Sequence, residues 1–181
     1  AETDIPDAIM SAASKFDVKM IGQTAALECT SEVLELSALR FREIVCSERC
    51  ADRCRGEFCG QAGWVLVGRG SSSSAATEKT RQFGRLRWQL TPTAHRQVAF
   101  IHGQQPTVEE ALDQLSAADL SIAVVQPHLL FSGLLMEQLT AQVSARQQRN
   151  PNQRWILTPT LGADQRLAEL LAERALAAIA N

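Results

Sequence analysis

Four of the five cysteines stand in one short segment, close enough in sequence for their thiolates to share a metal ion. They are spaced four, four and five positions apart, at Cys46, Cys50, Cys54 and Cys59. On a continuing helix the first three would line one face, and Gly56 would end that helix so that the fourth folds back. Four thiolates suit an iron–sulfur cluster or a zinc ion, although the segment lacks the Cys-x-x-Cys pair usual in both. A linker whose thiols bind no metal is the alternative.

A loop rich in glycine and serine is the second segment with the chemistry of a binding site. It reads Gly68-Arg69-Gly70 followed by four serines, and it leads into a helical pattern. Glycines let the main chain approach a ligand, and the N–H groups that begin the helix favour an anion. The guanidinium of Arg69 adds a fork that suits a carboxylate. We predict an anion-binding loop formed by Arg69, Gly70, Ser71 and Ser72, with a plain helix cap and turn as the alternative.

Two histidines and a second helix start follow other apolar runs in the same way. His102 closes one run, His128 comes directly after Pro127, and Ser132-Gly133 opens the next helical pattern. We predict that His128, Ser132 and Gly133 bind substrate. The alternatives are loop histidines and an ordinary helix cap.

Four short apolar runs alternate with helical patterns after residue 60. The runs cover residues 64–68, 98–102, 120–127 and 155–159, and the helical patterns cover about 73–90, 106–117, 131–148 and 162–179. This alternation predicts an α/β fold with a four-stranded parallel sheet and helices on both faces. Ligands bind outside the carboxyl ends of such strands. In the common strand order 2-1-3-4, Arg69 and His128 face one crevice, whereas His95 precedes its strand at the other end.

The first 45 residues resemble the end of a domain more than the start of one. A shift of 134 positions places Leu27 on Leu161 and Leu36 on Leu170, so a helix–strand–helix module occurs twice in the same apolar phase. A chance match of two amphipathic pieces is the alternative. We predict three parts: residues 1–45, the remnant of a first half; residues 46–61, a Cys-rich linker; and residues 62–181, a second complete domain. The remnant has apolar helix faces that must pack on the main unit or on a second chain.

Composition narrows the function classes. The chain is 45% hydrophobic and 21% charged, which is typical of a globular protein, and its net charge of −2 argues against nucleic-acid binding. No apolar run approaches the roughly 20 residues that span a bilayer, so we expect no membrane partner. The acidic start AETDIPDAIM is unlike a secretory signal, and we expect a cytoplasmic protein.

The string VLVGRGSSSSAATEKTRQFGRLRW resembles the first strand, loop and helix of the class II chelatases that act on sirohydrochlorin. More narrowly, its arginine-type glycine loop resembles the second half of the long tandem cobaltochelatases of cobalamin biosynthesis. VVQPHLLFSGLL and WILTPTLGADQRLAELLAERAL resemble the third and final strands and helices of that half. TDIPDAIMSAASKF and ECTSEVLELSALRFREI resemble the end of the first half.

The resemblance implies a chelatase-like, flavodoxin-like fold and a lyase that inserts Co²⁺ or Fe²⁺ into a tetrapyrrole. In the family's catalytic half two histidines bind that metal, and the matching positions here are Arg69 and Leu134. Arginine stays protonated and leucine has no lone pair, so we expect no catalytic residue in this chain alone. His102 stands where the family often has glutamate, so the resemblance makes it a candidate metal ligand.

The resemblance further implies that this half lines the tetrapyrrole cleft, with the missing first half or a second chain as its partner. Arginine and helix N-termini suit the carboxylates around the macrocycle, and apolar residues suit its face. Two other classes stay open at this point. One is a non-catalytic structural half, and the other is an anion-binding flavodoxin-like domain that takes no part in chelation.

Overall fold

The structure is a computed structural model, and it describes the chain except residues 1–3, 17–23, 25, 28, 46–58 and 181. It divides into two compact units, one made of Ala1–Leu27 with Asp164–Asn181 and the other of Glu28–Ala163. The first unit contains the helices α1 (Asp4–Lys15) and α6 (Gln165–Ala180). Within it, Arg174 donates a hydrogen bond of 2.5 Å to the carbonyl oxygen of Ala26. Among the described residues, no helix combines the length and the hydropathy needed to cross a bilayer.

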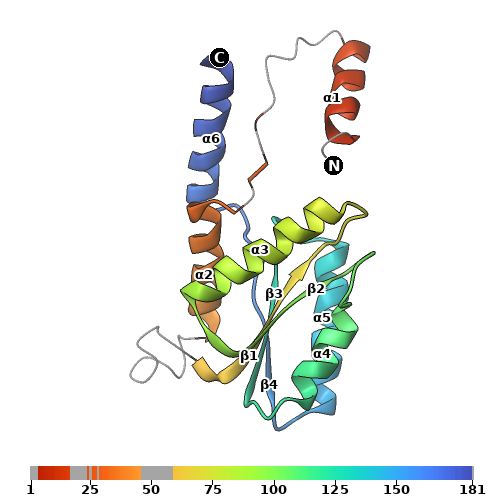
Figure 1. Cartoon of the computed structure of the whole chain (residues 1–181), viewed down its shortest axis with the longest axis vertical. Helices are drawn as coiled ribbons and strands as arrows, with labels where there is room; N and C mark the ends of the chain where they lie inside the picture. Colours follow the sequence, from red (N-terminus) through yellow and green to blue (C-terminus); the bar gives the residue numbers. More distant parts are fainter. Residues whose placement is uncertain (1–3, 17–23, 25, 28, 46–58, 181) are drawn as a thin grey trace. The chain divides into compact units, whose positions relative to one another are not determined.

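The second unit is an α/β structure built on a parallel sheet (Figure 1). Its strands are β1 (Cys59–Gly68), β2 (Thr93–Phe100), β3 (Ile122–Pro127) and β4 (Arg154–Leu157). Its helices are α2 (Ser31–Val45), α3 (Ser74–Leu90), α4 (Val108–Ala117) and α5 (Leu134–Arg149). All three pairings are parallel and the strand order is β2-β1-β3-β4, which confirms the predicted sheet and its order.

Helices cover both faces of this sheet, as predicted. Successive strand residues point to opposite faces, so β1 sends Val65 and Val67 to one side and Trp64 and Leu66 to the other. The first pair joins the main apolar core with α4 and α5, and the second pair lies on the side of α2 and α3 (Figure 1). That core consists of Val65, Val67, Ala99, Val108, Ala111, Leu112, Leu115, Ala123, Val125, Leu139, Val143 and Trp155.

A buried polar network ties the other face together around Arg87, whose side chain is fully inaccessible to solvent. Arg87 donates to the hydroxyls of Ser37 (3.1 Å) and Thr91, and to the amide oxygen of Gln126 (3.2 Å). The indole of Trp64 donates to the same amide oxygen at 2.8 Å. Gln126 in turn donates to the main-chain oxygen of Ser37 at 2.7 Å. The network therefore joins α2, α3, β1 and β3.

Element boundaries differ from the sequence-based prediction mainly on the two strands with polar starts. β1 begins at Cys59 rather than residue 64, because its first residues are partly exposed and carry no apolar signal. β2 begins at Thr93 rather than residue 98, because it is an edge strand whose residues 94–97 are exposed or half-buried and carry little apolar signal. His95 therefore lies inside β2 rather than before it, and His102 lies after the strand rather than closing it.

The expected remnant is described only in part. Its two helices are present as α1 and α2. The strand expected between them aligns with residues 21–25, of which the structure describes only Thr24. α2 packs against α3 and shares the Arg87 network. The division into residues 1–45, 46–61 and 62–181 stays a prediction.

We expect the change Gln126→Leu to lower the free energy of unfolding by about 3 kcal/mol, because it leaves the buried Arg87 and Trp64 donors without their shared acceptor. Urea denaturation at pH 7.5 measures this. The matched change Gln138→Leu, on an exposed glutamine of α5, should alter stability by less than about 0.5 kcal/mol. Equal stabilities of the two variants would show that the network is not needed for folding.

Candidate functional site

The carboxyl ends of the strands form a continuous rim, because main-chain hydrogen bonds continue beyond the sheet. The N–H of His128 donates to Val67 at 2.8 Å, and that of His102 donates to Arg69 at 3.0 Å. On the far side, Gly162 donates to Leu130 at 2.7 Å. We call the loops that these bonds connect the rim: residues 69–73, 101–107, 128–133 and 158–163. Arg69, Gly70, Ser71, Ser72, His102, His128, Ser132 and Gly133 all lie on it.

Gly70 is the residue that lets the first loop close against the second. Its φ of +91° is in the left-handed region, and a Cβ added there would lie 1.9 Å from the carbonyl oxygen of His102. The loop is held further by Gln104, whose amide donates to the Ser71 carbonyl oxygen at 2.8 Å. The rim is thus a closely fitted part of the main chain, and the position of Arg69 is set by it.

Some serines of this loop form hydrogen bonds within the loop and the start of α3, and others are exposed. Ser73 caps α3 by accepting a hydrogen bond from the Ala76 N–H, and Ser71 accepts one from the Ser73 N–H. The helix-cap alternative therefore describes these two hydroxyls. Ser72 and Arg69 are exposed, and among the described residues the Arg69 side chain forms no hydrogen bond or ion pair. Arg69 and Ser72 are the groups of this loop that a ligand can reach.

His128 lies on the rim in a different environment from the one expected of an anion-binding side chain. Its ring stacks on Phe83 with centroids 4.0 Å apart and planes 27° apart. Its Nδ1 is shielded from solvent and has no partner among the described residues. Burial lowers the pKa of His128 to about 4, so the ring is neutral at pH 7. The ring therefore contributes an uncharged, apolar face to the rim rather than a positive charge.

The start of α5 is open. Gly133 is its N-cap, its backbone is extended with φ 167°, and no side chain caps the helix. Around this start the chain exposes large apolar side chains: Leu130 (39%), Phe131 (65%) and Leu134 (75%). An uncapped helix start favours an anion, and the exposed side chains favour a flat apolar surface. Leu130 and Phe131 were not among the predicted site residues, although the sequence has three apolar residues in a row before this helix start.

The candidate metal ligands do not come together in the part of the chain that the structure describes. His102 is exposed on the rim, whereas Cys59 begins β1 at the opposite end of the sheet, where its N–H donates to Pro92 at 2.9 Å. Cys46, Cys50 and Cys54 lie outside the described residues. Within the described ranges no group of three His, Cys, Asp or Glu side chains is placed to hold a metal ion.

Comparison with known families and proteins gives one consistent match. The CbiX family model matches residues 63–178. The sirohydrochlorin ferrochelatase of Bacillus subtilis (strain 168) is 26% identical over 84% of this chain and 54% of its own length. The sirohydrochlorin cobaltochelatase of Priestia megaterium is 25% identical over 61% of this chain and 36% of its own length. The chain thus spans about half or less of the curated relatives that it matches.

Solved structures show the same fold. SirB from Bacillus subtilis with Fe³⁺ superposes with a TM-score of 0.77 at 24% identity, over 100% of this chain and 67% of that one. SirB from Bacillus subtilis subspecies spizizenii in complex with cobalt gives 0.70 at 22%, over 99% and 63%. A CbiX protein from Marinobacter aquaeolei VT8 gives 0.52 at 15%, over 64% and 93%.

The depressed pKa of His128 predicts a loss of stability in mild acid. The unfolded chain takes up a proton near pH 6.5 and the folded chain only near 4, so stability is complete above pH 6.5 and falls as the pH drops below it. By pH 5 the loss should reach about 2 kcal/mol. Urea denaturation at pH 7.5 and 5.0 measures the loss of stability. The variant His128→Leu has no ring to titrate at this position, so its loss between the two pH values should be smaller by about the same amount. An identical loss in both proteins would contradict the burial of the ring.

Proposed function

Because the chain belongs to the CbiX family, we propose that it is part of a chelatase that inserts Co²⁺ or Fe²⁺ into sirohydrochlorin or a closely related tetrapyrrole, and that its rim lines the macrocycle cleft. The observation that carries the proposal is the exposed apolar group Leu130, Phe131 and Leu134 beside the uncapped start of α5. Such a macrocycle is a flat apolar ring edged with carboxylates. The rim offers apolar side chains for the ring and positive groups for its edge.

Each group has a distinct task in this proposal. Phe131 and Leu134 contact the face of the ring, which removes their exposed area from water. Arg69 pairs with a peripheral carboxylate through its guanidinium fork. Ser72 and the N–H groups at Ser132-Gly133 donate hydrogen bonds to further carboxylate oxygens. His128 carries no charge at neutral pH and stacks on Phe83, so it adds no positive group to this surface.

Metal insertion needs ligands that this rim lacks. The family's two metal-binding histidines match Arg69 and Leu134, and neither side chain donates a lone pair. His102 is the one exposed imidazole on the described rim, and a lone histidine does not make a metal site. We therefore propose that the catalytic histidines come from a first half, of which residues 1–45 are the end, or from a second chain.

The proposal predicts binding without turnover. The purified chain should shift the absorbance of sirohydrochlorin, yet insert Co²⁺ no faster than the free reaction. Phe131→Ser and Arg69→Gln should each weaken binding about ten-fold, since each removes one ring or carboxylate contact. Arg149→Gln, at the far end of α5, is the control and should leave the titration unchanged. No spectral shift would favour a purely structural half, and rapid insertion that is lost on His102→Ala would place the metal site on this chain.

We also propose that the Cys-rich segment binds a metal centre, an iron–sulfur cluster or a zinc ion held by Cys46, Cys50, Cys54 and Cys59. Protein purified without oxygen should then be brown if it holds a cluster, or colourless with about one equivalent of zinc. Cys50→Ser should release the metal, whereas Cys29→Ser, outside the segment, should retain it. Metal analysis that finds neither iron nor zinc, with the four thiols of the segment all titratable, would remove the proposal.

A further inference from the structure

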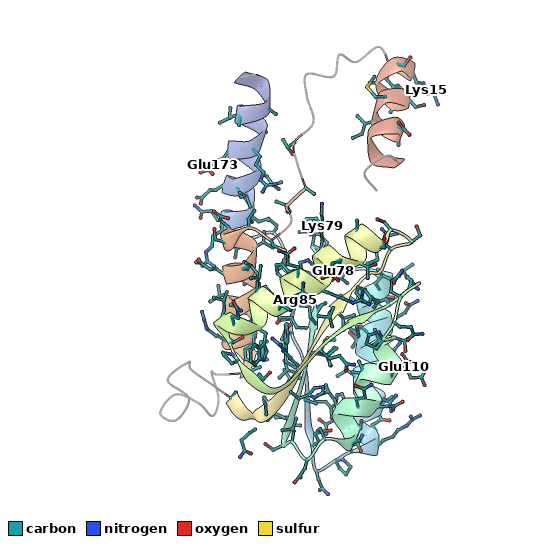
Figure 2. The ribbon with its side chains drawn as sticks, in the orientation of Figure 1. Lys15, Glu78, Lys79, Arg85, Glu110 and Glu173 are labelled. Atoms are coloured by element: carbon teal, nitrogen blue, oxygen red, sulfur yellow. The ribbon has the colours of Figure 1, made fainter. Side chains whose placement is uncertain are left out.

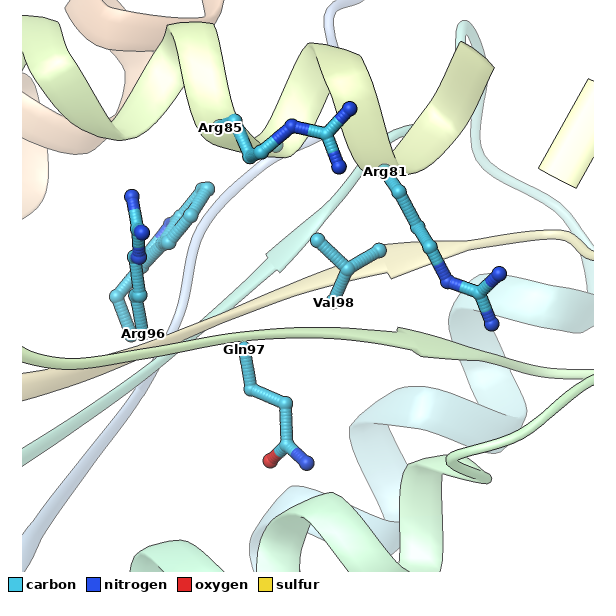
Figure 3. Close-up of a pocket in the computed structure, with 7 residues that line it drawn as sticks. Arg81, Arg85, Arg96, Gln97 and Val98 are labelled. Atoms are coloured by element: carbon cyan, nitrogen blue, oxygen red, sulfur yellow. The ribbon is translucent and has the colours of Figure 1, made fainter. Parts of the chain in front are cut away.

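A cavity of about 220 Å³ lies between α3 and the edge strand β2, and none of the residues that line it belongs to the rim. Its polar lining is dominated by three arginines, Arg81 and Arg85 from α3 and Arg96 from β2 (Figure 3). Between them lies an apolar floor that includes Val98 and Gly84. Figure 3 shows the three guanidinium side chains on both sides of Val98, so the cavity has positive walls and an apolar base.

The spacing of the residues explains why these charges meet. Arg81 and Arg85 are four positions apart and share one face of α3. Arg96 and Val98 alternate with Gln97, which points to the other face of the sheet and donates to Gln114 of α4 at 2.9 Å. Two helix positions and one strand position therefore place arginines around the same hollow.

Gly84 makes the hollow possible. A Cβ at this position would lie 2.3 Å from a methyl carbon of Val98, so glycine lets α3 approach β2 closely. The close approach brings the arginines of the helix down toward the strand. β2 is also an edge strand in the described sheet, and such a strand presents main-chain N–H groups that pair with no neighbouring strand.

The positive charge of the cavity is compensated only in part. Arg85 pairs with Glu78 at 2.8 Å, and both side chains are more than half exposed, at 54% and 57% (Figure 2). Arg81 donates to the carbonyl oxygen of Gln105 at 2.8 Å and lies over the ring of Phe100. Arg96 lies 4.4 Å from the centre of the Trp88 ring. Among the described residues, neither Arg81 nor Arg96 pairs with a carboxylate.

The contacts of Arg81 and Arg96 hold their side chains in place without neutralising them. An aromatic face and a carbonyl oxygen restrict a guanidinium but leave its charge and several of its N–H donors available. A guanidinium that is already ordered loses less entropy when it binds an oxyanion bidentately. The walls of the cavity are therefore preorganised for a ligand with negative oxygen atoms.

We propose that this cavity is a second binding site, separate from the rim, for a small ligand that carries two or more oxyanion groups, either carboxylates or phosphates. Arg81, Arg85 and Arg96 bind the oxygens, and Val98 contacts the carbon or bridging atoms between them. The volume is below the roughly 300–1,000 Å³ of sites for drug-sized ligands, so the ligand is smaller than a tetrapyrrole. The proposal stands independently of the tetrapyrrole function of the rim.

Isothermal titration of the 181-residue chain with pyrophosphate and with citrate, each at one ionic strength held with NaCl, tests the proposal. At least one of the two should bind saturably with one site per chain, and the better ligand distinguishes phosphate from carboxylate recognition. Arg96→Gln should weaken this binding about ten-fold or more. Arg166→Gln, on an exposed arginine of α6, is the control with the same loss of charge and should change binding less than two-fold.

A change that strengthens binding separates a built site from general attraction to a positive surface. Glu78→Gln removes the acid that pairs with Arg85, so it should tighten the binding of the same anion by about two- to five-fold. Saturable binding that Arg96→Gln weakens and Glu78→Gln strengthens would support the proposal. It would be overturned if neither anion bound saturably, or if Arg166→Gln lost as much affinity as Arg96→Gln.

Discussion

A buried arginine with no carboxylate partner among the described residues is the constraint on which one side of the sheet depends. Removing a guanidinium from water is costly, and burial, helped by the nearby Arg42, lowers the pKa of Arg87 to about 9. Neutral groups on α2 and β3 offset this cost with hydrogen bonds, and the rings of Phe41 and Trp64 lie 5.4 and 5.5 Å from the guanidinium. Only a few placements of α2 against the sheet allow all of these hydrogen bonds and ring contacts at once. The network therefore fixes that helix on the sheet.

The parallel direction of the strands brings the loops of the candidate site together at one edge of the sheet. Since all four strands run the same way, their carboxyl ends meet at one edge, and hydrogen bonds beyond the strands join the loops there. Close fit in the main chain, as at Gly70, then holds exposed side chains at defined positions. The rim can therefore expose apolar and charged side chains that take no part in the hydrophobic core. Such exposed groups are expected on a surface that binds a ligand.

The sequence predicted the parts that depend on local pattern. Apolar runs located all four strands, and helical periodicity with the Thr107 capping box located the helices, because burial on both faces leaves a strong signal. It did not reveal the burial of Arg87 and Gln126, since polar types are expected outside and only the assembled network makes their burial tolerable. It also missed Phe131, because an apolar side chain is normally read as part of a core. The polar start of β2 was missed because an edge strand needs no apolar run.

The fifteen arginines of the chain show why function could not be read from their number. Some are satisfied within the fold: Arg87 by neutral acceptors, and Arg146 by the carboxylate of Asp113. Others are ordered but not neutralised, as Arg96 is by the ring of Trp88. Charge that is satisfied internally stabilises the fold, whereas charge that is positioned and left uncompensated lowers the cost of binding an anion. Arginines on one side of α3 therefore stabilise the fold, whereas those on another side are available to bind a ligand. Only the packing around each arginine distinguishes the two roles.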